Sequence, residues 1–452
     1  MARISSLSEK PRSDTPRRLA DWLNPTVAMK VHSLVDKIYK KKNLELAWDK
    51  VRRNKGCGGV DGQSIEEFER EASQHLDRLH DELRTGTYRP QPVLQHLIPK
   101  AGQAGKYRTL GIPTVYDRVC QQAILNRLEG IFEPLFDDAS FGYRSGRSTK
   151  DALKKVWKEI EGGYEWIVDA DLENFFGSAD HAKVMTLLCQ RIADCKVLNL
   201  IETILKAGCM AEGRHLIIEE GVPQGGSLSP LISNILLTPF DWEMRRKGYN
   251  LTRYSDDWVI TCRTKAEAQS AMRSAKMVLE KLGVKLHSKK TRIIHVRGGF
   301  EFLGFKIKQG TRPMRLSADK IRGGARQGQM YAYPTQRSIT HFKDQIRSKT
   351  KRVVPLTTEE IVAELNPVIR GWGNYYKKAH VRKLFLQLKG WIVRRIRSHR
   401  HKKWRNCGWK TLPESKLYNE MGLVNLSLLI PSIASAKANL VKAGCGKTAR
   451  PV

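Results

Sequence analysis

The sequence lacks paired cysteines and long apolar runs, and each lack excludes a class of protein. Its eight cysteines are scattered without any Cys-x-x-Cys pair, which argues against a zinc site and a disulfide framework. No apolar run approaches the roughly 18 residues that a membrane span needs, and the N-terminus has no signal-peptide core. We therefore expect a cytoplasmic protein with free thiols and no membrane partner.

Acidic residues are scarce as well, and the shortage is uneven. The chain has 80 Lys and Arg against 46 Asp and Glu, a formal net charge of +34. From Leu365 to Pro413 there is no acidic residue, while fourteen Lys or Arg occur. Such an excess indicates a nucleic-acid partner, because neutralising phosphates with release of counterions is the main sequence-independent source of affinity.

Aromatic residues are interleaved with these cations. They are Trp372, Tyr375, Tyr376, Phe385, Trp391, Trp404 and Trp409. Rings beside cations are typical of an RNA-binding surface, where they stack on bases or ribose faces. At helical spacing the same rings are ordinary core residues. We expect most of them to be core, with the charges alone binding RNA.

The few acids that lie in apolar surroundings are the most informative residues. Tyr254-Ser255-Asp256-Asp257 is followed by Trp258-Val259-Ile260, and Asp171 lies in a similar setting after Val168-Asp169-Ala170. Converging buried carboxylates call for a bound cation, since an ionised carboxylate out of water costs several kcal/mol. Mg²⁺ suits hard oxygen ligands and leaves positions for phosphates, which indicates nucleotidyl transfer. The alternative is a surface hairpin with a solvated Asp-Asp turn.

Strand geometry sorts these acids. Successive side chains of a strand face opposite ways, so Asp256 and Asp257 share a site only at the tip of a tight hairpin. We therefore predict Asp171 and Asp256 as the metal-bridging pair, with Asp257 secondary.

Strand and helix signals mix without a strict βαβ alternation, which predicts an α+β palm. Strand signals lie at 93–98, 166–171, 216–218, 253–262 and 291–296, and helical stretches at 117–132, 149–161, 183–190, 228–244 and 266–282. Residues 306–334 are basic and Gly-rich, which is typical of a connection. Three helices are predicted after it, at 336–352, 357–378 and 381–404. The tail from Arg405 is either a small helical module or a loosely held extension.

Successive motifs resemble the blocks of reverse transcriptases encoded by bacterial group II introns. The motifs, in order, are Asn54-Lys55-Gly56 with Gly59-Val60-Asp61-Gly62, Ile98-Pro99-Lys100 with Lys106 to Thr114, Phe141-Gly142-Tyr143-Arg144, Val168 to Phe176, Gly221 to Pro230, Tyr254-Ser255-Asp256-Asp257, and Gly283 to Ile293 with Phe302-Leu303-Gly304-Phe305. Each is weak alone, but the ordered set is specific.

The resemblance implies a right-hand polymerase, with fingers and a ferredoxin-like palm followed by an all-helical thumb. The predicted segments are a flexible basic extension (1–30), fingers and palm (31–310), a basic Gly-rich connection (311–334), a thumb or maturase X domain (335–404) and a basic DNA-binding or extension segment (405–452). It also implies an RNA-directed DNA polymerase that extends a DNA primer on an RNA template with dNTPs, using Mg²⁺.

Roles for further residues follow from the same resemblance. Lys100 and Arg108 would hold the incoming triphosphate, and an ordinary basic loop is the alternative. Phe176 would exclude a ribose 2′-hydroxyl by bulk, or else is a core residue. Gln224, in a Pro-Gln-Gly-Gly turn, would touch the templating or incoming nucleotide. Lys290 would act as general acid to the pyrophosphate, with a solvated lysine as the alternative.

The predicted metal ligands are Asp171, Leu172, Asp256 and Asp257, and the chain departs from the family pattern at two other positions. The family usually has Ala where this chain has Ser255, and Asp where it has Gly177. Neither is a predicted ligand, so the enzyme prediction stands. Ser255 adds a hydroxyl beside the primer terminus, which would shift primer preference or activity.

Residues Leu365 to Tyr376 are similar to the maturase segment of the same intron proteins. Its implied role is to bind the parent group II intron RNA and to support its splicing and mobility. The His-Asn-His endonuclease module of some members has paired cysteines, and only Cys407 and Cys445 occur after the thumb here, so we expect an endonuclease-minus protein.

Two alternative functions stay open. One is a domesticated enzyme in DNA repair or phage defence, and the other is a non-catalytic RNA-binding splicing factor. The oligomeric state is also open, with a homodimer as one option.

Overall fold

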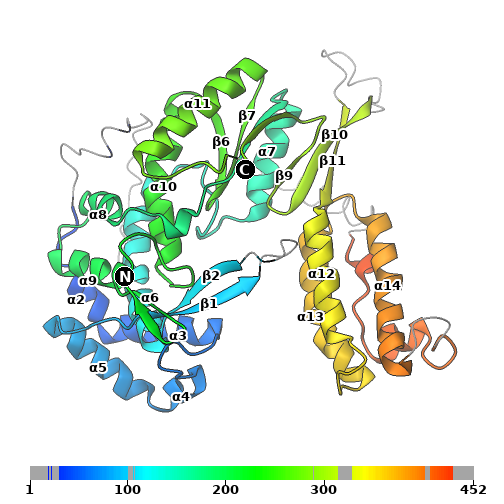
Figure 1. Cartoon of the computed structure of the whole chain (residues 1–452), viewed down its shortest axis with the longest axis horizontal. Coiled ribbons are helices and arrows are strands. Elements are labelled where there is room, and N and C mark those ends of the chain that lie inside the picture. The colour runs from blue at the N-terminus through cyan, green and yellow to red at the C-terminus, as the bar shows by residue number, and fades with distance from the viewer. Residues whose placement is uncertain are drawn as a thin grey trace, which may run out of the picture. The chain divides into compact units, whose positions relative to one another are not determined.

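The computed structural model describes Leu19, Trp22 and residues 30–99, 105, 107–288, 290–313, 328–402 and 408–430. The chain forms two compact units (Figure 1). Among the described residues, the first unit holds those up to Pro99 and from Tyr107 to His295. The second holds Gly105 and those from Val296 onward. The predicted extension over 1–30 lies almost wholly outside the described residues.

An antiparallel sheet in the first unit has the ferredoxin-like arrangement. Its strands are β3 (Trp166–Ala170), β6 (Asn250–Tyr254), β7 (Asp257–Cys262) and β8 (Arg292–His295), in the order β6-β7-β3-β8. Helices connect β3 to β6, a hairpin connects β6 to β7, and α11 (Lys265–Lys281) connects β7 to β8. This βαββαβ path with its first strand inside the sheet is the ferredoxin-like topology, which confirms the predicted fold class.

A second sheet of the first unit carries the predicted fingers. It has the order β2-β1-β4-β5, with β1 (Val93–Pro99) antiparallel to β2 (Tyr107–Ile112) and parallel to β4 (Cys209–Ala211), which pairs with β5 (Arg214–Leu216). The other helices of this unit are α2 (Val35–Tyr39), α3 (Lys41–Asn54), α4 (Ile65–Arg70), α5 (Ala72–Thr85), α6 (Val115–Phe132), α7 (Thr149–Glu161), α8 (His181–Cys189), α9 (Cys195–Leu205) and α10 (Ser229–Arg246), with short 3₁₀ turns at Glu133–Leu135 and Phe175–Gly177.

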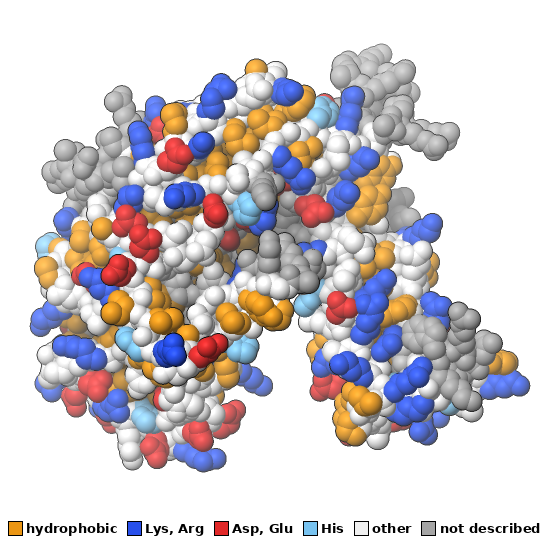
Figure 2. Space-filling view, in the orientation of Figure 1, with side chains coloured by type: hydrophobic (Ala, Val, Ile, Leu, Met, Phe, Trp, Pro, Cys, Tyr) orange, Lys and Arg blue, Asp and Glu red, His pale blue; other side chains and the backbone are white. Residues whose placement is uncertain are grey.

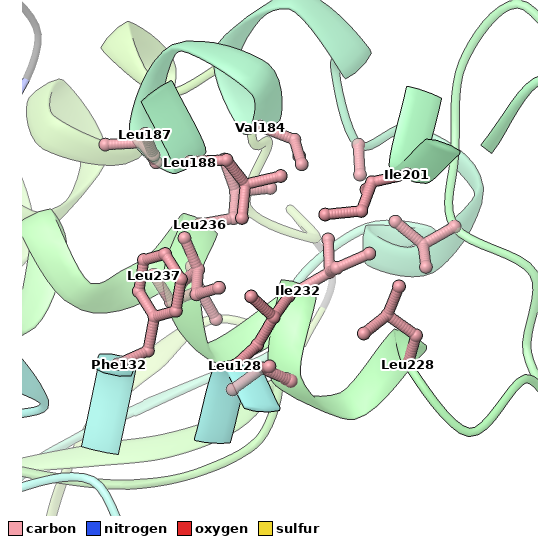
Figure 3. Close-up of a cluster of buried hydrophobic side chains, with 14 of the residues drawn as sticks. Leu128, Phe132, Val184, Leu187, Leu188, Ile201, Leu228, Ile232, Leu236 and Leu237 are labelled. Atoms are coloured by element: carbon pink, nitrogen blue, oxygen red, sulfur yellow. The ribbon is translucent and has the colours of Figure 1, made fainter. Parts of the chain in front are cut away.

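Helix α10 lies at the centre of the core. Most of its residues are buried, including the polar Asn234 and Asp241, and a helix that is buried on nearly all sides belongs inside a domain. Figure 3 shows its side chains packed between those of α6, α8 and α9; the labelled residues are Leu128, Phe132, Val184, Leu187, Leu188, Ile201, Leu228, Ile232, Leu236 and Leu237. Each such side chain stabilises the fold by about 1.5–3 kcal/mol. Helix α10 is therefore a rigid support for the polar groups it carries.

The second unit combines a small sheet with three helices. Strands β9 (Phe300–Phe302), β10 (Phe305–Pro313) and β11 (Gly328–Pro334) form an antiparallel sheet in the order β11-β10-β9. Helices α12 (Gln336–Lys349), α13 (Thr358–Tyr376) and α14 (Arg382–His401) follow, and the Thr335 and Thr357 side chains cap the first two. These helices lie within a few residues of the predicted ones.

The aromatics of this unit that were expected to be mostly core are only partly so. Tyr376 and Phe385 are buried, and Trp372, Tyr375 and Trp391 are half-buried. The Trp372 ring stacks on Phe342 at 4.5 Å between centroids and lies 5.8 Å from Phe385. Trp409 is 61% exposed, and Trp404 lies outside the described residues.

The described part of the tail is a small packed module. It contains a π-helical turn (Lys416–Glu420) and a 3₁₀ turn (Leu426–Leu429), and the latter contacts α13 and α14. A Cβ atom on Gly373 would lie 2.4 Å from the Leu429 side chain, so the two segments are in close contact. Residues 408–430 are therefore held against the helices.

The structure differs from the prediction between residues 296 and 334. The compact first unit ends at His295 rather than at 310. The segment predicted as a connection over 311–334 includes the end of β10 and all of β11, which pair as an antiparallel hairpin. Within the described ranges, none of the helices has both the length and the apolar content to span a bilayer.

Candidate active site

The register of the central sheet brings the predicted acids to one end. Ala170 of β3 pairs with Trp258 of β7, so Asp171 leaves the sheet beside Asp257. Directly paired residues of antiparallel strands have Cα atoms about 4.5–5.5 Å apart. Asp171 and the β6–β7 turn are therefore neighbours, although 85 positions separate Asp171 from Asp256 in sequence. All three carboxylates are partly exposed, as groups that receive a substrate must be.

The β6–β7 turn is a two-residue loop, as predicted for these acids. Tyr254 pairs with Asp257, which leaves Ser255 and Asp256 at the tip. Ser255 has a φ of +61°, in the left-handed region that tight hairpin loops require. Its side chain is buried, and its hydroxyl has no hydrogen-bond partner among the described residues. The departure from the family pattern thus places an unsatisfied hydroxyl beside the acids.

A buried arginine supports this turn. Arg253 is fully buried, and its Nε and Nη2 atoms donate to the two carboxylate oxygens of Asp241 on α10 at 2.7 and 2.5 Å. Its Nη1 donates to Asn234 Oδ1 and to the carbonyl oxygen of Ser255, both at 3.0 Å. Burial raises the pKa of Asp241 to about 6, and the guanidinium of Arg253 opposes that rise. Arg253 therefore ties the backbone of the turn to the central helix.

The sequence argument missed this role of Arg253, although a signal was present. An arginine within an apolar strand needs a carboxylate in the core, and Asp241 follows the apolar run Ile235-Leu236-Leu237 on a predicted helix. The pairing itself could not be read from the sequence, because it depends on how α10 lies against β6.

The motif Phe141-Gly142-Tyr143-Arg144 packs against the same turn. The Phe141 N–H donates to the Arg253 carbonyl at 2.8 Å, and Asn234 Nδ2 donates to the Gly142 carbonyl at 2.9 Å. A Cβ atom on Gly142 would lie 2.4 Å from the Ser255 nitrogen, so only glycine allows this approach.

Tyr143 links the turn to the fingers. Its ring lies 6.5 Å from that of Tyr254. Burial first, and then the carboxylate of Asp256, raise the pKa of Tyr143, whereas the guanidinium of Arg108 lowers it. Arg108, an exposed residue of β2, therefore lies within electrostatic range of Tyr143, as Asp256 does. Lys100, the other predicted phosphate ligand, lies outside the described residues.

Lys290 lies at Asp171. Its ammonium group forms an ion pair with Asp171 Oδ2, and the loop before it is held by a bond from the His287 N–H to the Asp171 carbonyl at 2.9 Å. Asp169, the other acid of β3, pairs instead with Arg292 at 3.0 Å.

Leu172 has no polar side-chain atom, so only its backbone can act as a metal ligand. It forms a β-bridge with Leu286, in which the bonding groups are the Asp171 carbonyl and the Glu173 N–H. Neither bond uses the Leu172 carbonyl.

Phe176 and Gln224 lie in loops that are joined by backbone hydrogen bonds. The Phe176 carbonyl accepts from the Val222 N–H at 2.6 Å, and the Gln224 carbonyl accepts from the Gly111 N–H of β2 at 2.7 Å. A Cβ atom on Gly225 would lie 2.5 Å from the Gly111 oxygen, and its φ is +130°, so glycine is required there. The Phe176 ring is half-buried, 5.3 Å from Phe175.

The oxygen atoms at the acidic end of the sheet are donors of the kind that Mg²⁺ prefers. No group of three or more His, Cys, Asp or Glu within the described part of the chain forms a metal-binding cluster. Two or three carboxylates and one carbonyl, all oxygen donors, leave room for water and phosphate, which is how Mg²⁺ is usually held. The ammonium of Lys290 on Asp171 shows that this carboxylate accepts a cation.

The second unit presents its cations on helix α14. Figure 2 shows Lys and Arg side chains gathered over the helices of this unit. Arg395 donates to Thr350 Oγ1 at 3.0 Å and Arg397 to the Leu412 carbonyl at 2.9 Å, so these two arginines hold the unit together. The exposed cations of α14 are Arg382, Lys383, Arg394 and Arg400.

Comparisons with known proteins match both units. The family of reverse transcriptases (RNA-dependent DNA polymerases) matches residues 98–307, and the group II intron maturase-specific domain matches residues 339–414. Protein YkfC of Escherichia coli (strain K12) is 31% identical over 336 residues, which cover 65% of this chain and 88% of that protein.

Two further relatives are named for introns. The group II intron-encoded protein LtrA of Lactococcus lactis subsp. cremoris is 28% identical over 411 residues, 73% of this chain and 68% of LtrA. An uncharacterized 91 kDa protein in the cob intron of Schizosaccharomyces pombe is 23% identical over 457 residues, 84% of this chain and 55% of that protein. The chain therefore belongs to the reverse transcriptases that carry a group II intron maturase domain, and it is an RNA-directed DNA polymerase.

Proposed function

We propose that this protein extends a DNA primer on an RNA template with dNTPs at the acidic end of the β3–β7 pair. Asp171, Asp256 and Asp257, with the Leu172 carbonyl, would hold the divalent ions, and Mg²⁺ is the ion that suits these donors. Two such ions, when bound, would activate the primer 3′-hydroxyl and stabilise the leaving pyrophosphate. The observation that carries the proposal is the register of β3 on β7, which makes Asp171 a neighbour of the β6–β7 turn.

The cations around the acids have separate tasks in this proposal. Arg108, within electrostatic range of Tyr143 beside the turn, binds the triphosphate and stabilises charge that develops on it. Lys290 donates a proton to the pyrophosphate. Its ion pair with Asp171 keeps it at the site and is exchanged for contacts to the substrate when the nucleotide binds.

Two uncharged side chains select the substrate. Phe176 lies in the short 3₁₀ turn after β3. Its half-buried ring would lie where a ribose 2′-hydroxyl would clash with it. Gln224 contacts the templating or incoming nucleotide. Its backbone bond to Gly111 fixes it relative to β2, which also carries Arg108.

We further propose that the protein binds its group II intron RNA and supports its splicing and mobility. The maturase-domain match over 339–414 and the exposed cations of α14 support this role.

The first test replaces one acid by its neutral isostere. Purified Asp256→Asn protein, given Mg²⁺, an RNA template and an annealed DNA primer, should lose dNTP incorporation by about 10²-fold or more, because a charged ligand is gone. Its RNA dissociation constant should stay within about twofold of the parent, since phosphate contacts by cations dominate affinity. Asp36→Asn, on the exposed face of α2, is the matched control and should incorporate normally. Comparable synthesis by Asp256→Asn would reject the metal assignment.

A further inference from the structure

The β10–β11 hairpin carries an exposed group of rings and cations that the polymerase site does not use. In this antiparallel pair, Lys308 lies opposite Tyr331 and Lys306 lies opposite Tyr333. Because side chains alternate along a strand, these four residues share one face. The opposite face carries Phe305, Ile307 and Met330, which are buried. The hairpin therefore has a buried inner face, apolar except for Gln309, and an outer face of aromatic and basic side chains.

The rings of Tyr331 and Tyr333 lie parallel to each other, and we call this pair the shelf. Their centroids lie 6.1 Å apart and their planes differ by only 10°. Tyr333 is 41% exposed, and Tyr331 is half-buried. An exposed ring parallel to a half-buried one on a strand leaves apolar surface in water, which indicates a ligand with flat apolar faces.

His380 completes the shelf and fixes it. Its N–H donates to the Ala332 carbonyl at 2.9 Å, and its Nδ1 accepts from the Ala332 N–H at 3.1 Å. These bonds pair the backbone N–H and carbonyl of Ala332 on β11, the end strand of its sheet (Figure 1). They also hold the imidazole 5.0 Å from the Tyr331 ring and 5.9 Å from the Tyr333 ring.

The charges on this face favour a polyanion. Lys306 and Lys308 are both exposed. One acid, Glu301 of β9, lies opposite Lys306, whereas the β9 pairing ends at Ile307 and leaves Lys308 without an opposing acid. Cations that follow a row of rings at strand spacing match the alternation of phosphates and bases in a single strand.

We propose that Tyr331, Tyr333 and His380, with Lys306 and Lys308, form a site that binds unpaired RNA bases by stacking and the adjacent phosphates by charge. The inference deepens the proposed RNA binding and rests on it. Duplex RNA is a poor ligand here, because its bases are already stacked on one another.

The test is a cycle between protein rings and RNA bases. The full-length parent and a Tyr331→Leu/Tyr333→Leu variant are titrated with a single-stranded RNA and with the same RNA carrying abasic sites. The parent should bind the abasic RNA about tenfold more weakly than the intact RNA. The variant should bind both with similar, weak affinity. If abasic sites weaken binding equally in the parent and the variant, Tyr331 and Tyr333 do not stack on RNA bases.

Two further variants separate the ring from the charge. Tyr331→Phe/Tyr333→Phe keeps the rings and should keep the parent affinity, which also controls for folding. Lys306→Gln/Lys308→Gln should lower the slope of log affinity against log salt by about 1.4, while Lys154→Gln/Lys158→Gln on α7 should not. An unchanged slope in the Lys306/Lys308 variant would mean that these two lysines do not contact RNA phosphates.

Failure of this site is distinguishable from failure of the polymerase. Primer extension tests the acids through Asp256→Asn, whereas the abasic-RNA cycle tests the rings, so each proposal has its own readout. If the parent binds no single-stranded RNA, both the proposed intron binding and this site are wrong, while primer extension remains a separate measurement.

Discussion

At the scale of single residues, Arg253 decides more than its position in a strand indicates. Its guanidinium joins β6, α10 and the Ser255 carbonyl, and both partners of its ion pair with Asp241 are fully buried. Buried pairs of this kind add little net stability, but losing one partner strands the other charge. The conformation of the acidic turn therefore depends on a pair that touches no substrate.

Arg253→Met should lower the free energy of unfolding by about 3–5 kcal/mol, because Asp241 is left buried and unpaired. Urea denaturation of the purified protein measures this. The double variant Arg253→Met/Asp241→Leu should recover most of the loss, since no charge then remains in the core. A double variant as unstable as the single one would mean that the hydrogen bonds to Asn234 and Ser255 matter more than the charge.

At the scale of elements, the Asp194 carboxylate caps the N-terminal ends of two helices. One carboxylate oxygen accepts from the Lys196 and Val197 N–H groups at the start of α9, at 3.1 and 3.4 Å. The other accepts from the Leu34 and Val35 N–H groups at the start of α2, at 2.7 and 2.8 Å. The cap on α9 follows from the local sequence. The cap on α2 is a tertiary contact that no local pattern predicts.

Asp194→Ala should destabilise the protein by about 1–2 kcal/mol at pH 7, as loss of an N-cap does. Desolvation raises the pKa of Asp194, but the four N–H donors outweigh it and lower the pKa below its usual value. A carboxyl with a lowered folded pKa stabilises above its unfolded pKa of about 3.9 and loses that contribution as pH falls through the folded value. The difference in unfolding free energy between parent and variant should therefore be full at pH 7 and shrink below about pH 4. A pH-independent difference would exclude the carboxylate as its source.

The β10–β11 hairpin is an element that sequence patterning did not predict. Its buried face includes the polar Gln309, which interrupts the alternation of Phe305 and Ile307. Its outer face carries Tyr331 and Tyr333, whose rings are largely apolar. The alternation of apolar and polar residues that predicts a strand is obscured when a polar residue lies on the buried face and aromatic residues lie on the exposed face.

At the scale of the whole molecule, the Lys and Arg side chains behind the net charge of +34 do not all have the same role. Burial first, and then Arg347 and Arg352, lower the pKa of Arg395. Arg395 nevertheless donates to Thr350, so its cation serves the packing of α14 on α12. Arg394 and Arg400 are exposed and have no such task in the described structure.

Arg394→Gln/Arg400→Gln should lower the slope of log RNA affinity against log salt by about 1.4, at about 0.7 for each phosphate contact to a single strand. Filter binding from low to moderate salt measures it. Lys276→Gln/Lys281→Gln on α11 removes the same charge and should leave the slope unchanged. Arg395→Gln should instead lower thermal stability. If the two double variants change the slope equally, the salt dependence of RNA affinity reflects the net charge of the protein rather than contacts made by α14.

The sequence by itself determined the kind of chemistry and the succession of segments. Carboxylates in apolar runs, a charge of one sign and ordered motifs are properties of the chain, so the α+β fold, the polymerase family and the helices at 336–401 were predicted from it. The same patterns predicted that Asp171 and Asp256 share a site. Only the tertiary structure decided which other groups meet: Arg253 on Asp241, Asp194 on two helices, and the shelf of Tyr331, Tyr333 and His380. These pairings depend on sheet register and on helix packing between residues far apart in the chain, and local propensity carries no information about either.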